Sequence, residues 1–496
     1  MTTQSPSKQG KSAARSSGIR ARFAPPAGLL ILLVLLAVPP PADMSAAAWR
    51  VAAVGTLMAF WWVTEALPVA VTALLPLVLF PLLGIAGVEA AAAPYADPVI
   101  FLFLGGLTLG LALQKWNLHR RIALRIVGLV GAKPVNLVLG FMAATAFLSM
   151  WVSNTATAAM MLPVSLSMVA LLVDAPERIS TAGRVEANFA LALLLGVAFA
   201  ASIGGIGTLI GTPPNALFAG FMRRSYGIEI GFAQWMLVGV PLAAVMLLGT
   251  WSILTRVVFP LPGQEPPGAR ERLRAETAAL GPMSRPERLV GLVFLAAAVA
   301  WIFRPLLAGA FPGLDDTVIA VAAALSLFLI PSGRGGALMD WETAFRLPWG
   351  VLLLFGGGLS LAAAISDSGL ADWLGAQLAL LGALPPVVLV LGLVAITIAL
   401  SELASNTATA AAFLPVAASI AAGLGLDAFT LTVPVALAAS CGFMLPVATP
   451  PNALFFGTGY ITVPQMARAG ALVDLLGAGL VLAALYGLAP IAFDMG

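Results

Sequence analysis

Two short polar turns, rich in hydroxyl and amide groups, interrupt long apolar stretches of this chain. Ser153-Asn154-Thr155 begins a segment that recurs unchanged at residues 405–411. A Ser or Asn before good helix formers is typical of an N-cap, and a helix N-terminus attracts anions. Hydroxyl, amide and carbonyl oxygens can also bind a hard cation such as Na⁺. Ser149 and Ser401, four residues before the motif serines, lie on the same helix face and add an oxygen to each turn.

A second polar motif also occurs twice. Thr212-Pro213-Pro214-Asn215 recurs as Thr449-Pro450-Pro451-Asn452, and the next three residues are identical as well. A Pro-Pro pair cannot continue a helix from upstream, but it can start one. The motif therefore predicts a helix break inside an apolar segment of each half, with a new helix N-terminus at each break.

The elements that carry these motifs form an internal repeat. Matching residues lie 252 positions apart from Gly105/Gly357 to Leu162/Leu414, and 237 apart at the Thr-Pro-Pro-Asn motifs. Arg and Lys flank the first Ser-Asn-Thr turn, whereas no Lys or Arg occurs between Arg346 and Arg468. Because basic residues favour the cytoplasmic side, the repeats are predicted to be inverted. Inverted repeats are typical of secondary transporters with a central site.

Composition indicates a membrane protein made of helices. Of the 496 residues, 60% are hydrophobic and 9% charged, and mean hydropathy is +1.01, which excludes an ordinary soluble protein. Cys441 is the only cysteine and His119 the only histidine, so disulfides and Cys- or His-rich metal centres are excluded. The predicted fold class is all-α and polytopic, with broken transmembrane helices and two re-entrant hairpins.

The expected domain organisation follows the repeat and the charge pattern. Residues 1–26 form a basic cytoplasmic tail, so that the N-terminus is cytoplasmic. Residues 27–259 hold the first membrane helix and the first repeat, with a cytoplasm-facing hairpin at about 134–173. Residues 260–288 form a polar cytoplasmic linker. Residues 289–496 hold the second repeat, with an outward-facing hairpin at about 385–424.

Charged side chains are nearly absent from the segments that carry the turns. No Arg or Lys lies between Lys133 and Arg178, or in the core of the second repeat. A dianion at mid-membrane would therefore rely on hydroxyls, amides, helix N-termini and bound cations. Glu65 and Glu402 are intramembrane acids by position, and such acids are functional candidates. Glu65 also fits a membrane boundary, and Glu402 fits either support of the turn or helix packing.

The paired turns and breaks, together with Trp61-Trp62-Val63-Thr64-Glu65-Ala66-Leu67-Pro68, resemble the divalent anion:sodium symporter (DASS) family, dicarboxylate branch. The resemblance covers nearly the whole chain after the N-terminal tail. It implies a homodimer in the inner membrane that moves a transport domain by an elevator mechanism and uses Na⁺. The substrates it implies are the C4-dicarboxylates succinate, malate and fumarate.

The resemblance also implies which residues bind. Sodium site 1 would use Ser149, Ser153, Asn154 and the backbone of Gly211. Sodium site 2 would use Ser401, Asn406 and the backbones of Ala404 and Ala448. The substrate would contact Asn154, Thr155, Thr212, Pro213, Ser405, Asn406, Thr407, Thr449 and Pro450. Ser401 stands where the family often has Thr, which keeps the oxygen.

Four alternatives remain open from the residues. The family also contains sodium-independent exchangers, but no cationic side chain near either turn could replace a sodium ion. Citrate or sulfate could be the substrate. An anion channel would need a continuous polar pore, whereas the polar groups here gather at two turns between apolar runs. An enzyme would need a nucleophile and a base, and no suitable His or acid pair lies near the motifs.

Overall fold

The computed structural model describes residues 8–131, 133–170, 183–261, 268–378, 384–493 and 495. Over these residues the chain is helical and contains no β-strand beyond one isolated bridge, Pro331 to Ala337. The predicted all-α class is confirmed. Eight of the described helices are long and apolar enough to cross a membrane, and five shorter apolar helices accompany them.

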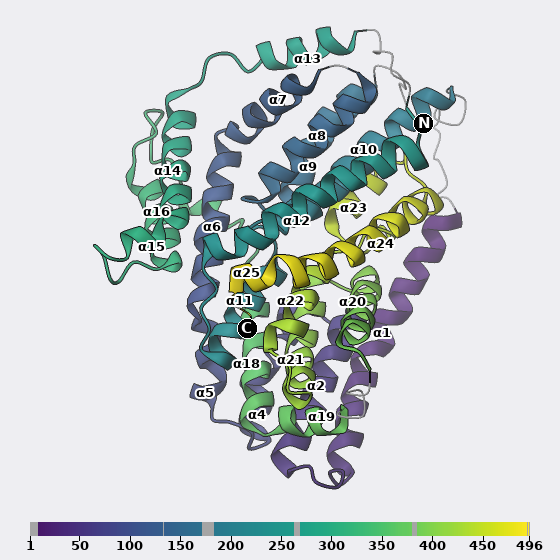
Figure 1. Cartoon of the computed structure of the whole chain (residues 1–496), viewed down its shortest axis with the longest axis vertical. Helices are drawn as coiled ribbons and strands as arrows, with labels where there is room; N and C mark the ends of the chain where they lie inside the picture. Colours follow the sequence, from purple (N-terminus) through teal and green to yellow (C-terminus); the bar gives the residue numbers. More distant parts are fainter. Residues whose placement is uncertain are drawn as a thin grey trace.

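The first half of the chain runs from α1 to η3 (Figure 1). Its elements are α1 Lys8–Ala37, α2 Ala46–Thr64, α3 Val69–Thr72, α4 Leu75–Leu82, α5 Val88–Ala92, η1 Ala93–Ala96, α6 Pro98–Lys115, α7 Leu118–Val130, α8 Pro134–Ser149, α9 Asn154–Val169, α10 Arg184–Gly205, α11 Pro213–Tyr226, α12 Phe232–Ser252 and the π-helix η3 Ile253–Val258.

The second half runs from α13 to the C-terminus. Its elements are α13 Ala269–Ala278, α14 Arg285–Ile302, α15 Arg304–Leu307, α16 Asp316–Leu329, α17 Trp341–Ala344, α18 Trp349–Asp367, α19 Leu370–Leu378, α20 Pro386–Leu403, α21 Asn406–Gly423, α22 Ala428–Ala438, α23 Pro450–Phe456, α24 Val463–Gly487 and α25 Ala489–Phe493.

Two expected ranges differ from the helices observed. The range 1–26, expected to be a tail, lies partly in α1, which is helical from Lys8 through Pro25 and Pro26. The range 260–288, expected to be a linker, contains α13 and the start of α14. A capping box between Ser284 and Glu287 starts α14 early, because each satisfies a backbone N–H of the other.

Helices break at all four polar motifs. Ser153 is the N-cap of α9 and Ser405 that of α21, so each Ser-Asn-Thr turn starts the second helix of a pair. Thr212 and Thr449 are the N-caps of α11 and α23, whose first residues are the proline pairs. Each half therefore supplies two helix N-termini inside apolar sequence, as the Pro-Pro and Ser-Asn-Thr patterns predict.

The two helix pairs lie toward opposite ends of the molecule, with α8 and α9 in its upper part and α20 and α21 in its lower part (Figure 1). The helices that start at the motifs pack across the halves, α9 against α23 and α11 against α21. Helix α10 packs against α8, α9, α12 and α23, and every residue from Phe189 to Gly205 is buried. Parts of both halves are thus brought together around the four breaks.

Candidate functional site

The first turn gathers oxygens from three segments. The end of the Asn154 amide that points into the turn lies 2.7 Å from Ser149 Oγ, 3.1 Å from the Ala201 carbonyl oxygen and 3.2 Å from that of Gly211. Ser149 Oγ also lies 2.6 Å from the Ala201 carbonyl oxygen, so its single O–H can donate either to that carbonyl or to the Asn154 amide oxygen. Three of the four predicted ligands of sodium site 1 are therefore adjacent, and Ala201 supplies an oxygen that the sequence prediction missed.

The Asn154 amide has two ways to satisfy these oxygens. With its nitrogen toward them, Nδ2 donates to all three. With Oδ1 toward them, the one Ser149 proton goes either to Oδ1 or to the Ala201 carbonyl. At least two of the inward oxygens then have no donor, and a bound cation would satisfy them. Hydroxyl, amide and carbonyl oxygens are the donors that a hard cation prefers. The residues present therefore fit Na⁺.

The second turn has buried oxygens that lack partners. Ser401 Oγ and Asn406 Oδ1 are both buried and find no hydrogen-bond partner among the described residues. A Cβ at Gly442 would lie 3.3 Å from the Ser401 carbonyl oxygen and 3.4 Å from Ala448 Cβ, so those two predicted site residues flank the same glycine. Ala404 has extended backbone at the end of α20, with φ −135° and ψ 169°. Unpaired buried oxygens favour binding of a cation here also.

The motif hydroxyls are not equivalent in the two halves. Ser153 Oγ accepts from the backbone N–H of Ala156 at 3.4 Å, so this hydroxyl caps α9. Ser405 makes no such cap in the described structure. Thr155 is exposed, whereas Thr407 is only 7% exposed. The first turn thus presents its threonine to the surroundings and the second turn encloses it.

The asparagines of the two Thr-Pro-Pro-Asn motifs hold the breaks together. Asn215 Nδ2 donates to the carbonyls of Gly205, Ile206 and Thr208, at 2.8–3.2 Å. Asn452 Nδ2 donates to those of Gly442 and Leu445, at 3.2 and 3.1 Å. Bonds that span ten and seven residues occur in both halves. Each asparagine satisfies carbonyls that the interrupted helix leaves without an intrahelical partner.

A further contact ties each break to the neighbouring Ser-Asn-Thr turn, with opposite chemistry in the two halves. In the first half the Thr208 hydroxyl donates to the backbone carbonyl of Met150. In the second half the Glu402 carboxylate accepts from the backbone N–H groups of Met444 and Leu445, at 2.7 and 2.8 Å. Of the two roles left open for Glu402, its hydrogen bonds favour support of the turn.

Several residues of the site carry no obvious signal in the sequence. The Ala201 carbonyl cannot be identified from its side chain. Gly205 lies against the first turn, where a Cβ would be only 2.5 Å from the Asn154 amide, and Gly442 lies beside Ser401 and Ala448 of the second site. Their recurrence 237 residues apart, in register with the Thr-Pro-Pro-Asn motifs, is the signal that could have found them.

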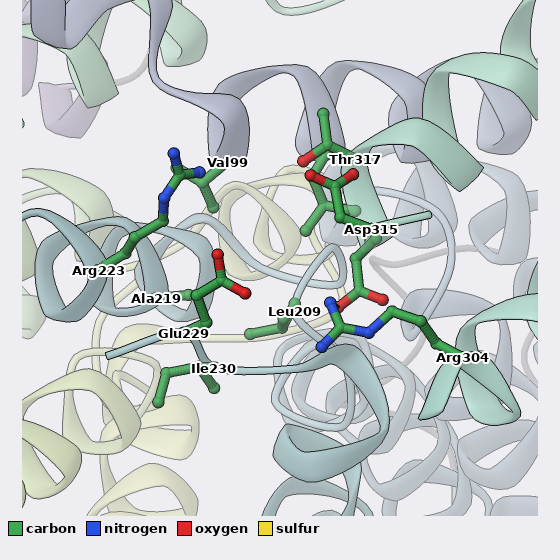
Figure 2. A pocket seen from close by; sticks show the side chains of 11 residues that line it. Val99, Leu209, Ala219, Arg223, Glu229, Ile230, Arg304, Asp315 and Thr317 are labelled. Atoms are coloured by element: carbon green, nitrogen blue, oxygen red, sulfur yellow. The ribbon is translucent and has the colours of Figure 1, made fainter. Parts of the chain in front are cut away.

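Glu65 and the cavity in Figure 2 lie apart from the turns. Glu65 is exposed and forms the C-cap of α2 in the left-handed conformation, φ 51°, which fits a structural role. The cavity measures about 50 Å³ and lies beside α6, α11 and α16 (Figure 2). Its lining contains none of the predicted site residues and consists of Val99, Leu102, Leu209, Ala219, Arg223, Glu229, Ile230, Arg304, Asp315, Asp316 and Thr317.

Comparison with known proteins places the chain among transporters. The family model described as "Sodium:sulfate symporter transmembrane region" matches residues 24–489. The chain is 41% identical over 475 residues to the sodium-dependent dicarboxylate transporter SdcS of Staphylococcus saprophyticus, covering 93% of this chain and 90% of that protein. It is 41% identical over 474 residues to SdcS of Staphylococcus aureus strain USA300, covering 94% and 91%.

A solved structure supports the fold alone. The crystal structure of the Alcanivorax borkumensis YdaH transporter, described as having an unusual topology, matches with a TM-score of 0.56 and 16% identity over 89% of this chain and 99% of that one. The family match covers nearly all the described helices, including both turns and both breaks. The chain therefore belongs to the sodium:sulfate symporter family, the divalent anion:sodium symporters that its paired motifs indicate.

Proposed function

We propose that the chain is a secondary transporter that carries C4-dicarboxylates such as succinate, malate and fumarate together with Na⁺. The observation that carries the proposal is the pair of turns whose buried oxygens gather with no Arg or Lys in α8, α9, α20 or α21. Two relatives that match over most of the chain are sodium-dependent dicarboxylate transporters by name, which supports both the ion and the substrate class.

The proposed sodium sites lie one in each half. Site 1 consists of Asn154 Oδ1, Ser149 Oγ and the carbonyl of Gly211, with Ser153 on the same turn and the Ala201 carbonyl added. Site 2 consists of Ser401 Oγ, Asn406 Oδ1 and the backbones of Ala404 and Ala448. The proposed substrate site comprises Asn154, Thr155, Thr212, Pro213, Ser405, Asn406, Thr407, Thr449 and Pro450.

Binding of substrate and of sodium should reinforce each other. Neutral dipoles alone would have to hold a dianion, so each sodium ion offsets charge that no nearby side chain neutralises. A bound sodium ion also selects the amide orientation that turns Asn154 Oδ1 inward, and it thereby fixes the turn that presents Thr155. By linkage, substrate must raise sodium affinity by the same factor.

Alternating access is proposed to be an elevator movement of inverted repeats in a homodimer of the inner membrane. The opposite placement of the two helix pairs in Figure 1 supports inversion. The distribution of Arg and Lys supports a cytoplasmic N-terminus, an inward-facing first hairpin and an outward-facing second hairpin. In this arrangement each hairpin would open the shared site to one side of the membrane.

The function is tested by uptake of labelled succinate into proteoliposomes with and without an inward sodium gradient. We expect saturable accumulation that sodium stimulates and that malate and fumarate inhibit. Citrate and sulfate competition defines the limits of the substrate class. Uptake that needs an internal dicarboxylate but no sodium would instead identify an exchanger, passive conductance a channel, and chemical conversion of succinate an enzyme.

The orientation is tested by cysteine labelling in a Cys441→Ala background. Cysteines replace Arg184, near the first hairpin, and Ala422, near the second, both of which are exposed. A membrane-impermeant maleimide should label Ala422→Cys from outside the cell and Arg184→Cys only after the membrane is opened. Labelling of both from one side would contradict the inverted arrangement.

A further inference from the structure

The residue Trp151, just before the first turn, is enclosed by aromatic rings. It stacks on Phe232 of α12 with ring centroids 6.0 Å apart, and it forms a T-shaped pair with Phe294 of α14 with centroids 5.0 Å apart. Phe232 in turn stacks on Trp301 at 4.4 Å, with planes 9° apart. A Cβ at Gly110 of α6 would lie 3.0 Å from the Trp151 carbonyl oxygen. The chain entering the turn is therefore held by three helices.

The stacked rings of Trp151, Phe232 and Trp301 form an aromatic column. A buried carboxylate fixes its far end, at Phe232 and Trp301. Asp316 Oδ2 accepts from the backbone N–H of Phe232 at 2.7 Å, and the backbone carbonyl of Asp316 accepts from Trp301 Nε1 at 3.0 Å. Arg304 lies 3.5 Å from the same carboxylate and lines the cavity of Figure 2. The column is thus anchored by contacts that do not involve the turn itself.

Among the residues that the structure describes, no matching column lies beside the second turn. The residue that corresponds to Trp151 by the repeat spacing of 252 is Leu403, which is 62% exposed, whereas Trp151 is 8% exposed. Similarly, Ile210 before the first break is 2% exposed, whereas its counterpart Val447 is 72% exposed. The two turns have nearly the same sequence, but the residues next to them are buried in the first half and exposed in the second. The aromatic column is therefore a feature of the first turn.

We propose that Trp151 is a positioning residue that holds Ser153, Asn154 and Thr155 in register for cation binding at the first turn. The effect of the indole passes through the backbone of residues 151–153. Because each aromatic pair contributes a modest free energy that is lost on truncation, Trp151→Ala should raise the sodium concentration for half-maximal uptake roughly 10-fold. The inference rests on the proposed function for its transport readout.

Four variants test it in proteoliposomes across a sodium series at constant ionic strength. Trp151→Ala should shift the sodium half-saturation with little change in maximal rate, and Trp151→Phe should largely restore it. Leu403→Ala is the matched control at the second turn and should leave sodium half-saturation unchanged. Phe355→Ala removes a different buried aromatic, paired with Phe103 at 5.1 Å, and controls for general loss of core packing.

Hydrogen–deuterium exchange of the purified proteins gives a second readout that does not depend on transport. Backbone amides of residues 150–158 should exchange faster in Trp151→Ala than in wild type, while those of residues 402–410 should not change in Leu403→Ala. Equal sodium shifts in Trp151→Ala and Phe355→Ala, or unchanged exchange at residues 150–158, would overturn the positioning role. Wild-type uptake without sodium dependence would overturn the proposed function, and the exchange measurement would still decide the role of Trp151.

Discussion

Replacing Gly205 by alanine should disturb the geometry of the first turn, although Gly205 is not itself one of the predicted sodium or substrate ligands. The new Cβ would lie 2.5 Å from one end of the Asn154 amide and 3.1 Å from the Gly211 carbonyl oxygen. To reach an ordinary contact of 3.4 Å, the amide must move by about 1 Å. A displacement of that size breaks the contacts with Ser149 and Ala201, which are 2.7 and 3.1 Å long.

The expected cost follows from the bonds that are lost. A hydrogen bond or ligand contact to a charged partner is worth roughly 1.5–3 kcal/mol, which corresponds to about 10- to 150-fold in affinity. Gly205→Ala should therefore shift sodium-dependent succinate binding to higher sodium by a factor in that range. Equilibrium binding to purified protein is measured over a sodium series in which choline keeps the ionic strength constant, so that screening is held fixed.

Gly442→Ala is the matched control in the other half. Its Cβ would lie 3.3 Å from the Ser401 carbonyl oxygen and 3.4 Å from Ala448 Cβ, so the neighbours need move only a few tenths of an ångström. We expect a much smaller shift than for Gly205→Ala. Monodisperse Gly205→Ala protein with wild-type thermal stability and wild-type sodium dependence would refute the assignment of the Asn154 amide to a cation site.

Three further predictions concern single side chains. Asn154→Ala and Asn406→Ala should each reduce succinate uptake and weaken its sodium dependence about 10-fold or more, and correctly inserted variants with normal uptake would remove those residues from the site. Asn452→Ala leaves two buried carbonyls without a donor, so it should destabilise the protein by roughly 1–3 kcal/mol, measured by thermal unfolding in detergent. The pKa of Asp340 is lowered to about 2 by its hydrogen bond from Lys115 and then by a backbone N–H; the resulting stabilisation is present above the usual value of 3.8 and is lost as pH falls toward 2. Lys115→Met should therefore lower the unfolding temperature near neutral pH, and the difference from wild type should shrink as the pH is lowered through this range.

The sequence predicts the breaks well because their causes are local. Pro213-Pro214 and the Ser-Asn-Thr turns restrict the backbone through residues that stand next to each other, so four helix N-termini follow from short stretches of sequence alone. The duplicated motifs also identify the polar groups that gather in the first turn, including Ser149 and Asn154.

What the sequence could not show depends on tertiary contacts. The Ala201 carbonyl reaches the first turn from a point 52 residues away from Ser149, and a residue of any type could offer the same backbone oxygen. The opposite packing of Trp151 and Leu403 likewise depends on α12 and α14, whose aromatic rings enclose only the first of these two positions. Repetition of sequence therefore predicts shared chemistry, but not shared surroundings.

In each half a hydrogen bond connects the Ser-Asn-Thr turn to the helix break, but the side chain that makes it comes from the break in the first half and from the turn in the second. This difference constrains which substitutions each half tolerates. Thr208 acts through its side chain on the backbone of Met150, whereas Glu402 acts through its side chain on the backbone of Leu445. Positions 150 and 402 correspond by the repeat, as do 208 and 445. Saturation mutagenesis should find that positions 150 and 445, which contribute only backbone atoms, accept many residue types. Positions 208 and 402, which contribute side chains, should accept few. The two repeats could then not replace each other in the chain, although the sequences of their motifs are identical.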